Sequence, residues 1–384
     1  MAFFDVSRDW VILAPQNKAA RTAAAELSRY IALLRKQAEL NQKPPAIKDA
    51  DGPAPEDSVP VIILNSDNGS AARNGFTWRL GRDRLEFYGN SDRGLCNGVF
   101  DFLAALEIRW PERGREELPP PPAAGAYKLK LSDACSYPLR EDRAHVPSEP
   151  AAEPGGRGST PDTALKNRRR LVVQGPVKPH DLDALIQWAA RNRIDALVFS
   201  LREKSLWEKF LKKPRRHWVF ETAEKYSLAI EWGGWDLSFL APRGYFFFHR
   251  ELFRMDSGKR VKQYNFCPTN HETIILLKKQ AAAIFREAAA IFREAASAAA
   301  PERVYHLWPD RGEERTWCSC PACRAFSPEE QNRIAVNAAA DVLAEIDPHA
   351  RLSWYEAPSD SPESEIPLRG NLFRLTELPE IVSL

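Results

Sequence analysis

The strongest constraint on the fold is the regular alternation of strand-like and helix-like segments in the second half of the chain. Four apolar runs have the length of buried strands: 194–201, 228–235, 303–310 and 351–358. Helical patterns surround them, over 180–192, 205–213, 220–227, 271–299 and 328–345. Strands that alternate with helices of this length are typical of βα units around a parallel sheet. We therefore predict an α/β fold built on a parallel sheet.

The N-terminal part has a different order of elements. Strand-like runs cover 9–15, 59–65, 75–80 and 84–90, and helical patterns cover 17–36 and the segment that begins at Ser91 or Asp92. The last two runs alternate apolar and polar residues around Gly81, which favours a hairpin. Residues 42–58 are rich in Pro, Asp and Gly and are predicted to form a loop. The order β-α-β-β-β-α indicates a compact α/β domain.

A low-complexity segment separates the two patterns. Residues 147–166 read PSEPAAEPGGRGSTPDTALK, a composition typical of a linker or a surface insertion. We therefore predict an N-terminal α/β domain over 1–130, a linker leading into the next domain over 131–170, and a second domain over 171–384.

Charge and composition exclude several classes of partner. The net charge is +2, with 54 Lys and Arg against 52 Asp and Glu, so no strong attraction to nucleic acid or to a membrane surface is expected. No apolar run approaches the roughly 20 residues of a membrane span. Asp5, Arg8 and Asp9 stand where a secretory signal would have its apolar region. We therefore expect a cytoplasmic protein with reduced cysteines.

The stretch 303–324, RVYHLWPDRGEERTWCSCPACR, holds the most chemistry. Residues 304–308 suit a buried strand, and Pro309 ends strand pairing because it has no N–H to donate. Asp310 therefore stands at the carboxyl end of a strand, where parallel α/β sheets place ligands and catalytic groups. Ser327, followed by Pro and two Glu, predicts the start of the next helix.

Two sets of residues carry a resemblance to known families. Residues 89–119 resemble the end of the N-terminal domain that precedes the barrel in bacterial alpha-glucuronidases and beta-N-acetylhexosaminidases. The matching positions are Gly89, Arg93, Gly94, Gly98, Phe100, Leu103 and Trp110. The second half resembles a large bacterial family of glycosidase-like barrels of unknown function that carries this N-terminal domain. Its matching segments are 249–260, 266–270 and 303–323, and the resemblance spans most of 9–360.

The resemblance implies a small α/β N-terminal domain followed by a (β/α) TIM-type barrel. It implies a glycoside hydrolase that acts on a carbohydrate or glycoconjugate and requires no cofactor. A full barrel takes about 250 residues, and the chain ends soon after what we count as the fifth barrel strand. We therefore expect a barrel that is truncated at its C-terminal end. The family tends to carry histidine after the strand that reads LAIEWGG here, where this chain has Trp235 and Asp236.

Glycoside hydrolysis needs two carboxyl groups, an acid for the leaving oxygen and a second group that acts as nucleophile or base. In the resembling hexosaminidases the acid follows the fourth barrel strand. That position makes Asp310 the first candidate here, with Glu313 or Glu314 as the reserve. Glu356 ends the next strand and is the predicted partner, at the separation of about 5–10 Å that either mechanism requires. The competing interpretation is that Asp310 caps a loop or pairs with Arg311 or Arg315, and that Glu356 is an exposed loop acid.

Six residues are candidates for binding a sugar. Tryptophans at strand ends can stack on a sugar face, and an arginine can hold hydroxyl or carboxylate oxygens. The candidates are Trp232, Trp235, Asp236, Arg140, His249 and Trp308. The alternative is that the indoles pack around a tight turn, that His249 hydrogen-bonds a loop and that Arg140 forms a surface salt bridge.

The CxCxxC motif places Cys318, Cys320 and Cys323 within six residues. Zinc takes four ligands, so a structural zinc site would need a fourth from Cys267, His306 or His271. Reduced thiols that only pack in the loop are the alternative. Two other functions remain open: a non-catalytic carbohydrate-binding protein or remnant of an enzyme, and a zinc-stapled interaction module. The oligomeric state, the sugar and the linkage are not given by these patterns.

Overall fold

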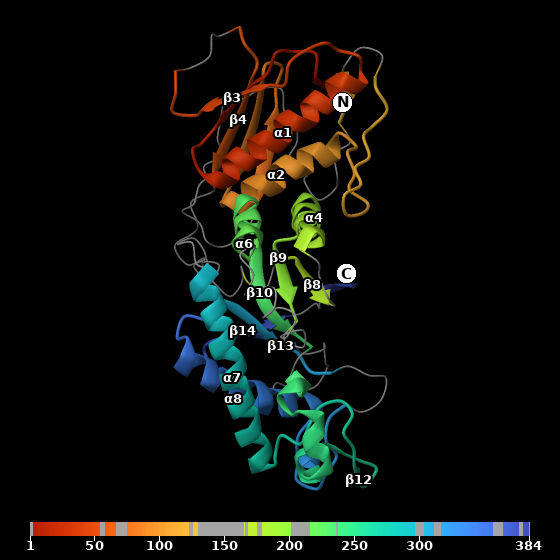
Figure 1. The fold of residues 1–384 in the computed structure, drawn as a ribbon, viewed down its shortest axis with the longest axis vertical. Coiled ribbons are helices and arrows are strands. Elements are labelled where there is room, and N and C mark those ends of the chain that lie inside the picture. The colour runs from red at the N-terminus through yellow and green to blue at the C-terminus, as the bar shows by residue number, and fades with distance from the viewer. Residues whose placement is uncertain are drawn as a thin grey trace. The chain divides into compact units, whose positions relative to one another are not determined.

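The computed structural model describes residues 3–53, 58–66, 75–122, 126–129, 165, 168–174, 179–200, 216–235, 237–295, 303–310, 316–355, 364–375 and 379–383 (Figure 1). The chain divides into two compact units. The N-terminal unit comprises Met1–Arg169, Pro179–Asp195 and Val219–Leu228, and the C-terminal unit comprises Arg170–Lys178, Ala196–Trp218 and Ala229–Leu384. The domain boundaries drawn from the sequence stay predictions.

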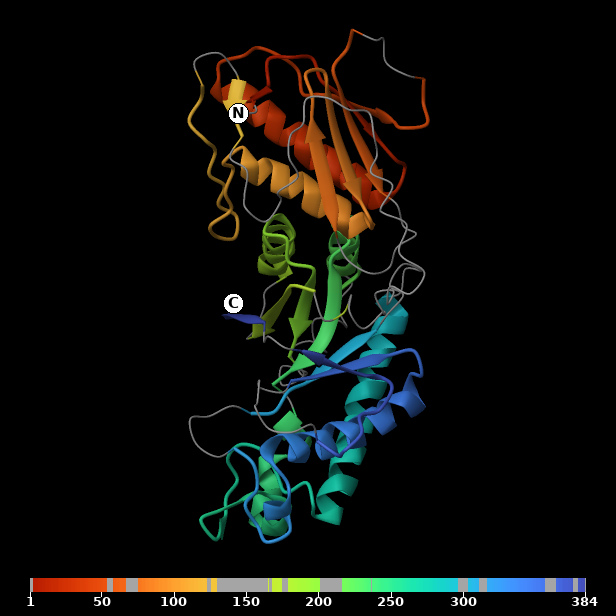
Figure 2. The same ribbon diagram turned by 180° about the vertical axis from the view of Figure 1, so that it is seen from behind.

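The N-terminal unit is built on a five-stranded sheet with the order β3-β2-β4-β6-β5. Its strands are β2 (Val11–Ala14), β3 (Ala46–Asp49), β4 (Val61–Ser66), β5 (Phe76–Leu80) and β6 (Arg84–Gly89). β5 and β6 form the predicted antiparallel hairpin, and the other pairs are parallel. Helices α1 (Lys18–Gln37) and α2 (Asp92–Ala105) cover one face of the sheet (Figure 2). A separate antiparallel pair joins β1 (Phe3–Asp5) to β7 (Ala126–Lys128).

Strand β3 lies inside the segment 42–58, which was predicted to be a loop, and that prediction is wrong for these four residues. β3 pairs in parallel with β2 at the edge of the sheet, from Ala46 opposite Val11 to Asp49 opposite Ala14. Only Ile47 of the four is even partly buried. An edge strand has one partner and buries little apolar surface, so its sequence carries no alternating pattern.

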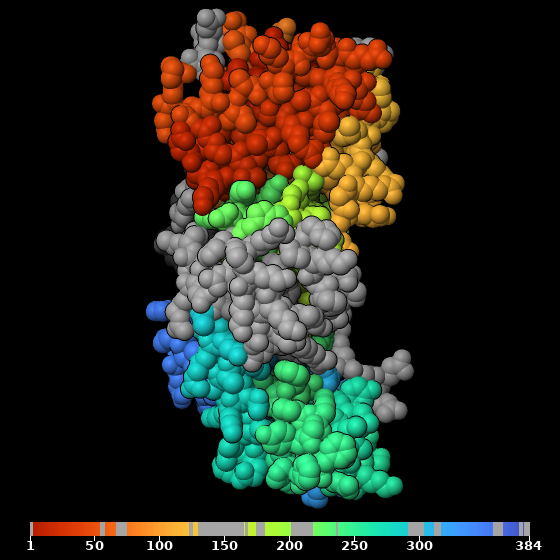
Figure 3. Space-filling view, viewed as in Figure 1, coloured from red at the N-terminus to blue at the C-terminus, as the bar shows by residue number. Residues whose placement is uncertain are grey.

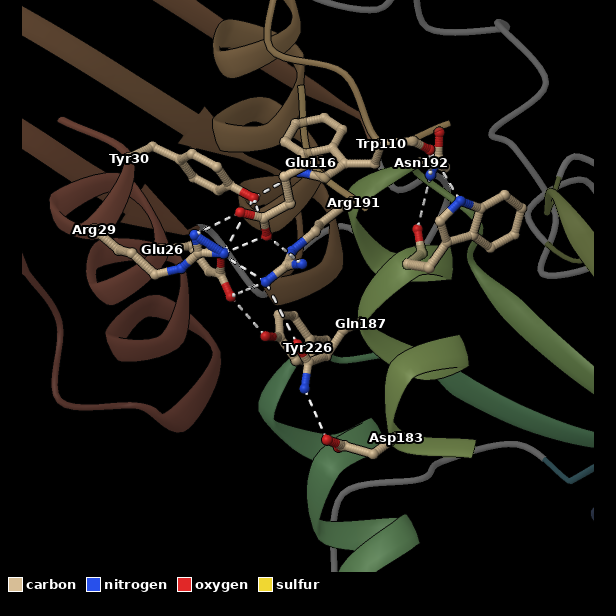
Figure 4. A network of polar contacts seen from close by, with 11 residues as sticks. Glu26, Arg29, Tyr30, Trp110, Glu116, Asp183, Gln187, Arg191, Asn192 and Tyr226 are labelled. Carbon is tan, nitrogen blue, oxygen red and sulfur yellow. Dashed lines mark hydrogen bonds and ion pairs between the residues drawn. The ribbon is translucent and has the colours of Figure 1, made fainter. Parts of the chain in front are cut away.

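A buried polar network ties α4 (Pro179–Arg191) to α1 within the N-terminal unit (Figure 4). Arg191 donates to Glu116 Oε1 at 2.8 Å and to Glu26 Oε1 at 3.1 Å, and Tyr226 donates to the same Glu26 oxygen at 2.7 Å. Burial, with the Glu26 carboxylate beside it, raises the pKa of Tyr226 well above its usual value. The tyrosine therefore remains a donor, and the paired charges can lie in the interior.

Arg93 of α2 makes a second internal link. Its guanidinium is buried and donates to the carbonyl oxygens of Ala190 at 3.1 Å, Ile194 at 2.6 Å and Tyr226 at 3.1 Å. Its Nε lies 3.6 Å from Asp195 Oδ1. Arginine can serve several acceptors at once because it has five donors. These bonds explain why the segments 179–195 and 219–228 group with the N-terminal unit.

The C-terminal unit contains a seven-stranded sheet with the order β15-β14-β13-β10-β9-β8-β16. Its strands are β8 (Arg170–Gln174), β9 (Ala196–Phe199), β10 (Ala229–Gly234), β13 (Val304–Leu307), β14 (Arg351–Tyr355), β15 (Leu372–Leu375) and β16 (Glu380–Ser383). All neighbouring pairs in it are parallel. β13 lies between β10 and β14, which confirms the prediction from the βα rhythm.

The strand order bears on the predicted barrel. From β8 to β15 each strand pairs with the next one along the chain, and β16 pairs with the other edge of β8. The order reverses between β8 and β16, as it does at the switch point of a doubly wound sheet. A closed barrel would also need a ladder between β15 and β16. Among the described residues no ladder joins β15 to β16, so the fold is α/β with a parallel sheet, and closure into a barrel stays a prediction.

Two long helices belong to the C-terminal unit and pack against each other: α7 (His271–Ala295) and α8 (Pro328–Ile346). α8 begins as predicted, because Ser327 Oγ accepts from the Glu330 N–H while the Glu330 carboxylate accepts from the Ser327 N–H. Helix α6 (Arg216–Lys225) precedes β10 in the chain, and most of it belongs to the N-terminal unit. Among the described residues no helix is both long and apolar enough to cross a bilayer.

The segment from 235 to 270, here called the β10–α7 loop, contains only short elements. They are η3 (Leu237–Leu240), η4 (Arg243–Phe247), η5 (Arg250–Leu252), β11 (Met255–Asp256) and β12 (Lys259–Arg260). Much of this loop, green in Figure 3, lies at the surface. The segment 308–327, here called the β13–α8 loop, contains η6 (Cys323–Ala325). These two loops follow neighbouring parallel strands, so both start from the carboxyl edge of the sheet.

Candidate active site

One face of the parallel sheet carries a chain of buried polar side chains from four strands. Arg170 of β8 donates to Glu231 Oε2 of β10 at 2.6 Å, and His306 Nε2 of β13 lies 2.8 Å from the same oxygen. His306 Nδ1 lies 2.5 Å from Ser353 Oγ of β14, and Trp308 Nε1 donates to that oxygen at 2.9 Å. All five residues are buried.

Sheet register brings these residues together. His306 is paired with Ser353 on one side and with Gly233 on the other, two residues after Glu231. Side chains that are opposite each other or two residues apart share a face of a sheet. An ionised carboxylate only accepts hydrogen bonds, so Nε2 of His306 carries a hydrogen toward Glu231. The buried charge of Glu231 is thus met by both Arg170 and His306.

Three tryptophans predicted to bind a sugar differ in what they offer a ligand. Trp308 directly follows β13 and is fully buried, and Trp232 within β10 is buried against Phe199, with ring centroids 5.7 Å apart. Trp235 directly follows β10 and is only partly buried. Its ring packs edge-on against Trp308 at 4.9 Å. Of the three, Trp235 is the indole with surface left for a sugar face.

The two glycines before Trp235 lie close to the backbone of the neighbouring strand, β13. Gly233 has φ +115°, and a Cβ there would lie 1.9 Å from the carbonyl oxygen of His306. Gly234 has φ +132°, and its carbonyl oxygen accepts from Trp308 N at 2.7 Å. Gly233 is required because β13 leaves no room for a side chain, and both residues have a positive φ that favours glycine.

Asp310 is held between the two loops. Its carboxylate Oδ2 lies 3.2 Å from Arg243 Nη2, and its N–H donates to Asn265 Oδ1 at 3.0 Å. Asn265 Nδ2 in turn donates to Thr316 O at 3.1 Å. The Asp310 side chain is 18% exposed. The arginine partner is Arg243, from the β10–α7 loop, and the carboxylate keeps access to solvent at the carboxyl edge of the sheet.

The other predicted site residues divide into two groups. His249 is described and lies at the surface, 55% exposed, with Nδ1 3.3 Å from Glu251 Oε1. It belongs to an exposed aromatic segment in which Phe247 is 71% and Phe248 86% exposed. The remaining candidates lie outside the described residues: Glu356, Glu313, Asp236 and Arg140.

The CxCxxC motif is completed by a fourth cysteine. The sulfurs of Cys267, Cys318, Cys320 and Cys323 all lie within 4.8 Å of one another, and all four residues are buried. Hydrogen bonds from Cys318 and Cys323 lower the pKa of the Cys267 thiol far below its usual value. Thiolate is the form of cysteine that binds metals.

The other two residues weighed as a fourth ligand lie elsewhere. His306 belongs to the polar chain of the sheet, and His271 is the exposed first residue of α7.

Sequence reasoning missed most of the buried polar chain. Glu231 and Ser353 were not singled out, and His306 was weighed only as a metal ligand. A usable signal was present, because Glu231, His306 and Ser353 are each a single polar residue inside an apolar strand. Three such exceptions in adjacent parallel strands are expected to bond one another, since isolated buried polar groups are costly.

Comparison with known proteins gives solved structures only, since no family model and no curated protein matches the chain. A GH20 exo beta-N-acetylglucosaminidase from Vibrio harveyi is similar at 13% identity and TM-score 0.44, over 92% of this chain and 52% of that one. Streptomyces plicatus N-acetyl-beta-hexosaminidase is similar at 12% identity and TM-score 0.47, over 92% and 62%. Flavobacterium johnsoniae chitobiase is similar at 10% identity and TM-score 0.47, over 92% and 50%.

The chain spans about half to two thirds of the length of these three solved structures. Identities of 10–13% with TM-scores below 0.5 determine neither a substrate nor an activity.

Proposed function

We propose that this chain is a glycoside hydrolase-like protein that binds a carbohydrate or glycoconjugate at the carboxyl edge of its parallel sheet. The observation that carries the proposal is the position of Asp310, a partly exposed carboxylate just after β13, beside the β10 end that carries Trp235. Carboxylates and aromatic rings at this edge are what a βα sheet needs to bind and cleave a sugar. The proposal places the protein in the cytoplasm, without a nucleic-acid or membrane partner.

In this proposal the polar chain of the sheet sets the geometry of the site. Ser353 fixes Trp308 through the indole N–H, and Trp308 supports Trp235 edge-on. Trp235 then offers a rigid aromatic surface for a sugar ring. A ligand-facing group whose support is fully bonded loses little conformational freedom on binding.

The chemical roles follow the two-carboxylate scheme. Asp310 is the proposed acid, Glu356 its proposed partner and Glu313 the reserve, with Asp236, Arg140 and His249 proposed to bind sugar hydroxyls. A separation of about 5–5.5 Å between the two carboxyl groups would make the enzyme retaining, and about 6.5–9.5 Å would make it inverting.

The test is turnover by purified protein on a panel of chromogenic glycosides that includes beta-N-acetylhexosaminides and alpha-glucuronides. Asp310→Asn keeps the shape and removes the acidic proton, so turnover should fall by about 10²–10⁴, the usual share of general acid–base catalysis. Asp341→Asn is the matched control, because Asp341, on α8, also pairs with an arginine: its Oδ1 lies 2.6 Å from Arg369 Nε. Equal turnover by parent and Asp310→Asn would exclude Asp310 as the acid.

Glu356→Gln and Glu313→Gln identify the second carboxylate on the same panel. The true partner should lose turnover as Asp310→Asn does, while the other variant should stay near the parent. Glu356→Ala and Glu313→Ala remove the side chain and leave a space. External azide should restore product formation, with inverted configuration, in the variant that lacks the nucleophile of a retaining enzyme, because a small anion can occupy that space.

The Asp310–Arg243 ion pair favours a second candidate, a non-catalytic carbohydrate-binding protein. A carboxylate paired with a guanidinium at 3.2 Å is a hydrogen-bond acceptor, and such a group binds sugar hydroxyls without donating a proton. Calorimetric binding to sugars on which the parent shows no turnover would establish this function. In that case Asp310→Asn would weaken sugar binding, and there would be no turnover for it to reduce.

A further inference from the structure

The four clustered cysteines have the geometry of a metal site, although Cys267 lies far from the other three in the sequence. Cys267 Sγ lies 3.8 Å from Cys320 Sγ and 3.6 Å from Cys323 Sγ. Four thiolates around one zinc, with Zn–S bonds of about 2.3 Å, lie about 3.8 Å apart at the corners of a tetrahedron. The observed separations therefore match a closed four-sulfur site before any metal is added.

The surroundings of the sulfurs suit a negatively charged metal–thiolate centre. Met255 N donates to Cys318 Sγ at 3.2 Å and Cys320 N donates to it at 3.5 Å. Arg260 Nη1 lies 3.7 Å from the same sulfur. N–H donors and one guanidinium are the groups expected around thiolates that carry more charge than a divalent ion neutralises.

We propose that Cys267, Cys318, Cys320 and Cys323 bind one zinc ion as a structural site. Each thiol gives up one proton as its sulfur binds the metal, and no oxidation state changes. All four positions around the ion are filled by protein, so the site has no open position for a substrate or a water. The zinc is structural and takes no part in the proposed hydrolysis.

The site joins the two loops that hold Asp310. Cys267 lies in the β10–α7 loop, and the other three ligands lie in the β13–α8 loop. Asn265, two residues before Cys267, donates to Thr316 O, two residues before Cys318, and accepts from Asp310 N. Zinc binding would therefore fix this contact, and with it the position of the Asp310 backbone at the edge of the sheet.

Metal analysis of the full chain, purified without chelators, tests the proposal. Inductively coupled plasma mass spectrometry should find one zinc per chain, with iron below a tenth of that amount. X-ray absorption at the zinc edge should show four sulfur neighbours at about 2.3 Å. Cys267→Ser should reduce bound zinc at least tenfold after dialysis. Cys96→Ser is the matched control, because Cys96 is a buried cysteine of the N-terminal unit outside the cluster, and it should keep one zinc.

Absence of stoichiometric metal from protein grown with added zinc would overturn the proposal, and so would iron in place of zinc or nitrogen and oxygen neighbours in the absorption spectrum. If Cys267→Ser does not fold, the spectrum of the parent still decides. A second measurement follows the loops: removal of zinc by a chelator should speed amide exchange in 260–270 and 316–326 at least tenfold and leave α1 unchanged. No sugar enters these measurements, so their outcome is independent of the proposed hydrolysis.

Discussion

His306 Nε2 lies 2.8 Å from Glu231 Oε2 between two side chains that are 0% and 2% exposed. Arg170 completes this ion-pair chain from the other side at 2.6 Å. Each group in it is buried only because the others meet its charge or its hydrogen-bonding capacity. Side chains of β8 and β13, on either side of β10 in the sheet, therefore both bond to Glu231 of β10.

Replacement of Glu231 should destabilise the fold strongly. Glu231→Ala leaves the Arg170 guanidinium buried without its carboxylate, and removal of one partner of a buried pair costs about 3–5 kcal/mol. Urea unfolding followed by tryptophan fluorescence measures the change. Glu117→Gln is the control, because Glu117 pairs with Arg115 at the surface with 48% and 58% exposure, and exposed pairs contribute about 0–1 kcal/mol. If Glu231→Ala lowers the free energy of unfolding no more than the control does, the buried ion pairs of Glu231 contribute no stability.

The Arg191–Glu26 pair of Figure 4 should behave as a coupled unit. Arg191→Met leaves the Glu26 carboxylate buried with Tyr226 as its remaining side-chain donor among the described residues, and we expect a loss of about 3–5 kcal/mol. The double variant Arg191→Met with Glu26→Gln removes both charges, so it should be more stable than Arg191→Met alone. Additive losses in this double-mutant cycle would contradict the coupling.

Gly233→Ala should lower stability because the added Cβ would meet the His306 carbonyl oxygen at 1.9 Å and because φ is +115°. Backbone atoms of a central strand cannot move aside, so we expect a loss above about 1 kcal/mol. Gly244→Ala is the matched control, since no atom lies within 4 Å of its added Cβ. Alanine has less backbone freedom than glycine in the unfolded chain, so Gly244→Ala should be as stable as the parent or slightly more stable. Thermal melts of the two variants, recorded side by side, separate the outcomes.

Because of Cys96, the stability of the fold should decrease as the pH rises in the alkaline range. Burial raises the pKa of the Cys96 thiol from 9.0 to about 12, an effect that Arg93 partly offsets. Between these values the unfolded chain loses a proton that the folded chain keeps. The contribution is therefore complete below pH 9 and is lost as pH rises toward 12. Urea midpoints of the parent should fall more steeply than those of Cys96→Ala between pH 8 and 10.5, and parallel curves would contradict the assignment.

Several elements could be predicted from the sequence alone because their signals are local. The Ser327 capping box, the hairpin around Gly81 and the apolar run of β13 each depend on neighbouring residues, and all three are present. The parallel order of β10, β13 and β14 followed from the alternation of strands and helices, since short βα connections leave few other topologies. The position of Asp310 at the carboxyl end of β13 followed from the same reasoning.

What the sequence left open depends on residues that meet only in the tertiary structure. Cys267 stands more than forty residues before Cys318, and only the folding of two loops from adjacent strands shows that it, and not a histidine, completes the cysteine cluster. Edge strand β3 depends on a partner, β2, because its own residues bury too little to form a pattern. Register decides the bond between Glu231 and His306, since a shift of one residue would turn either side chain to the opposite face of the sheet.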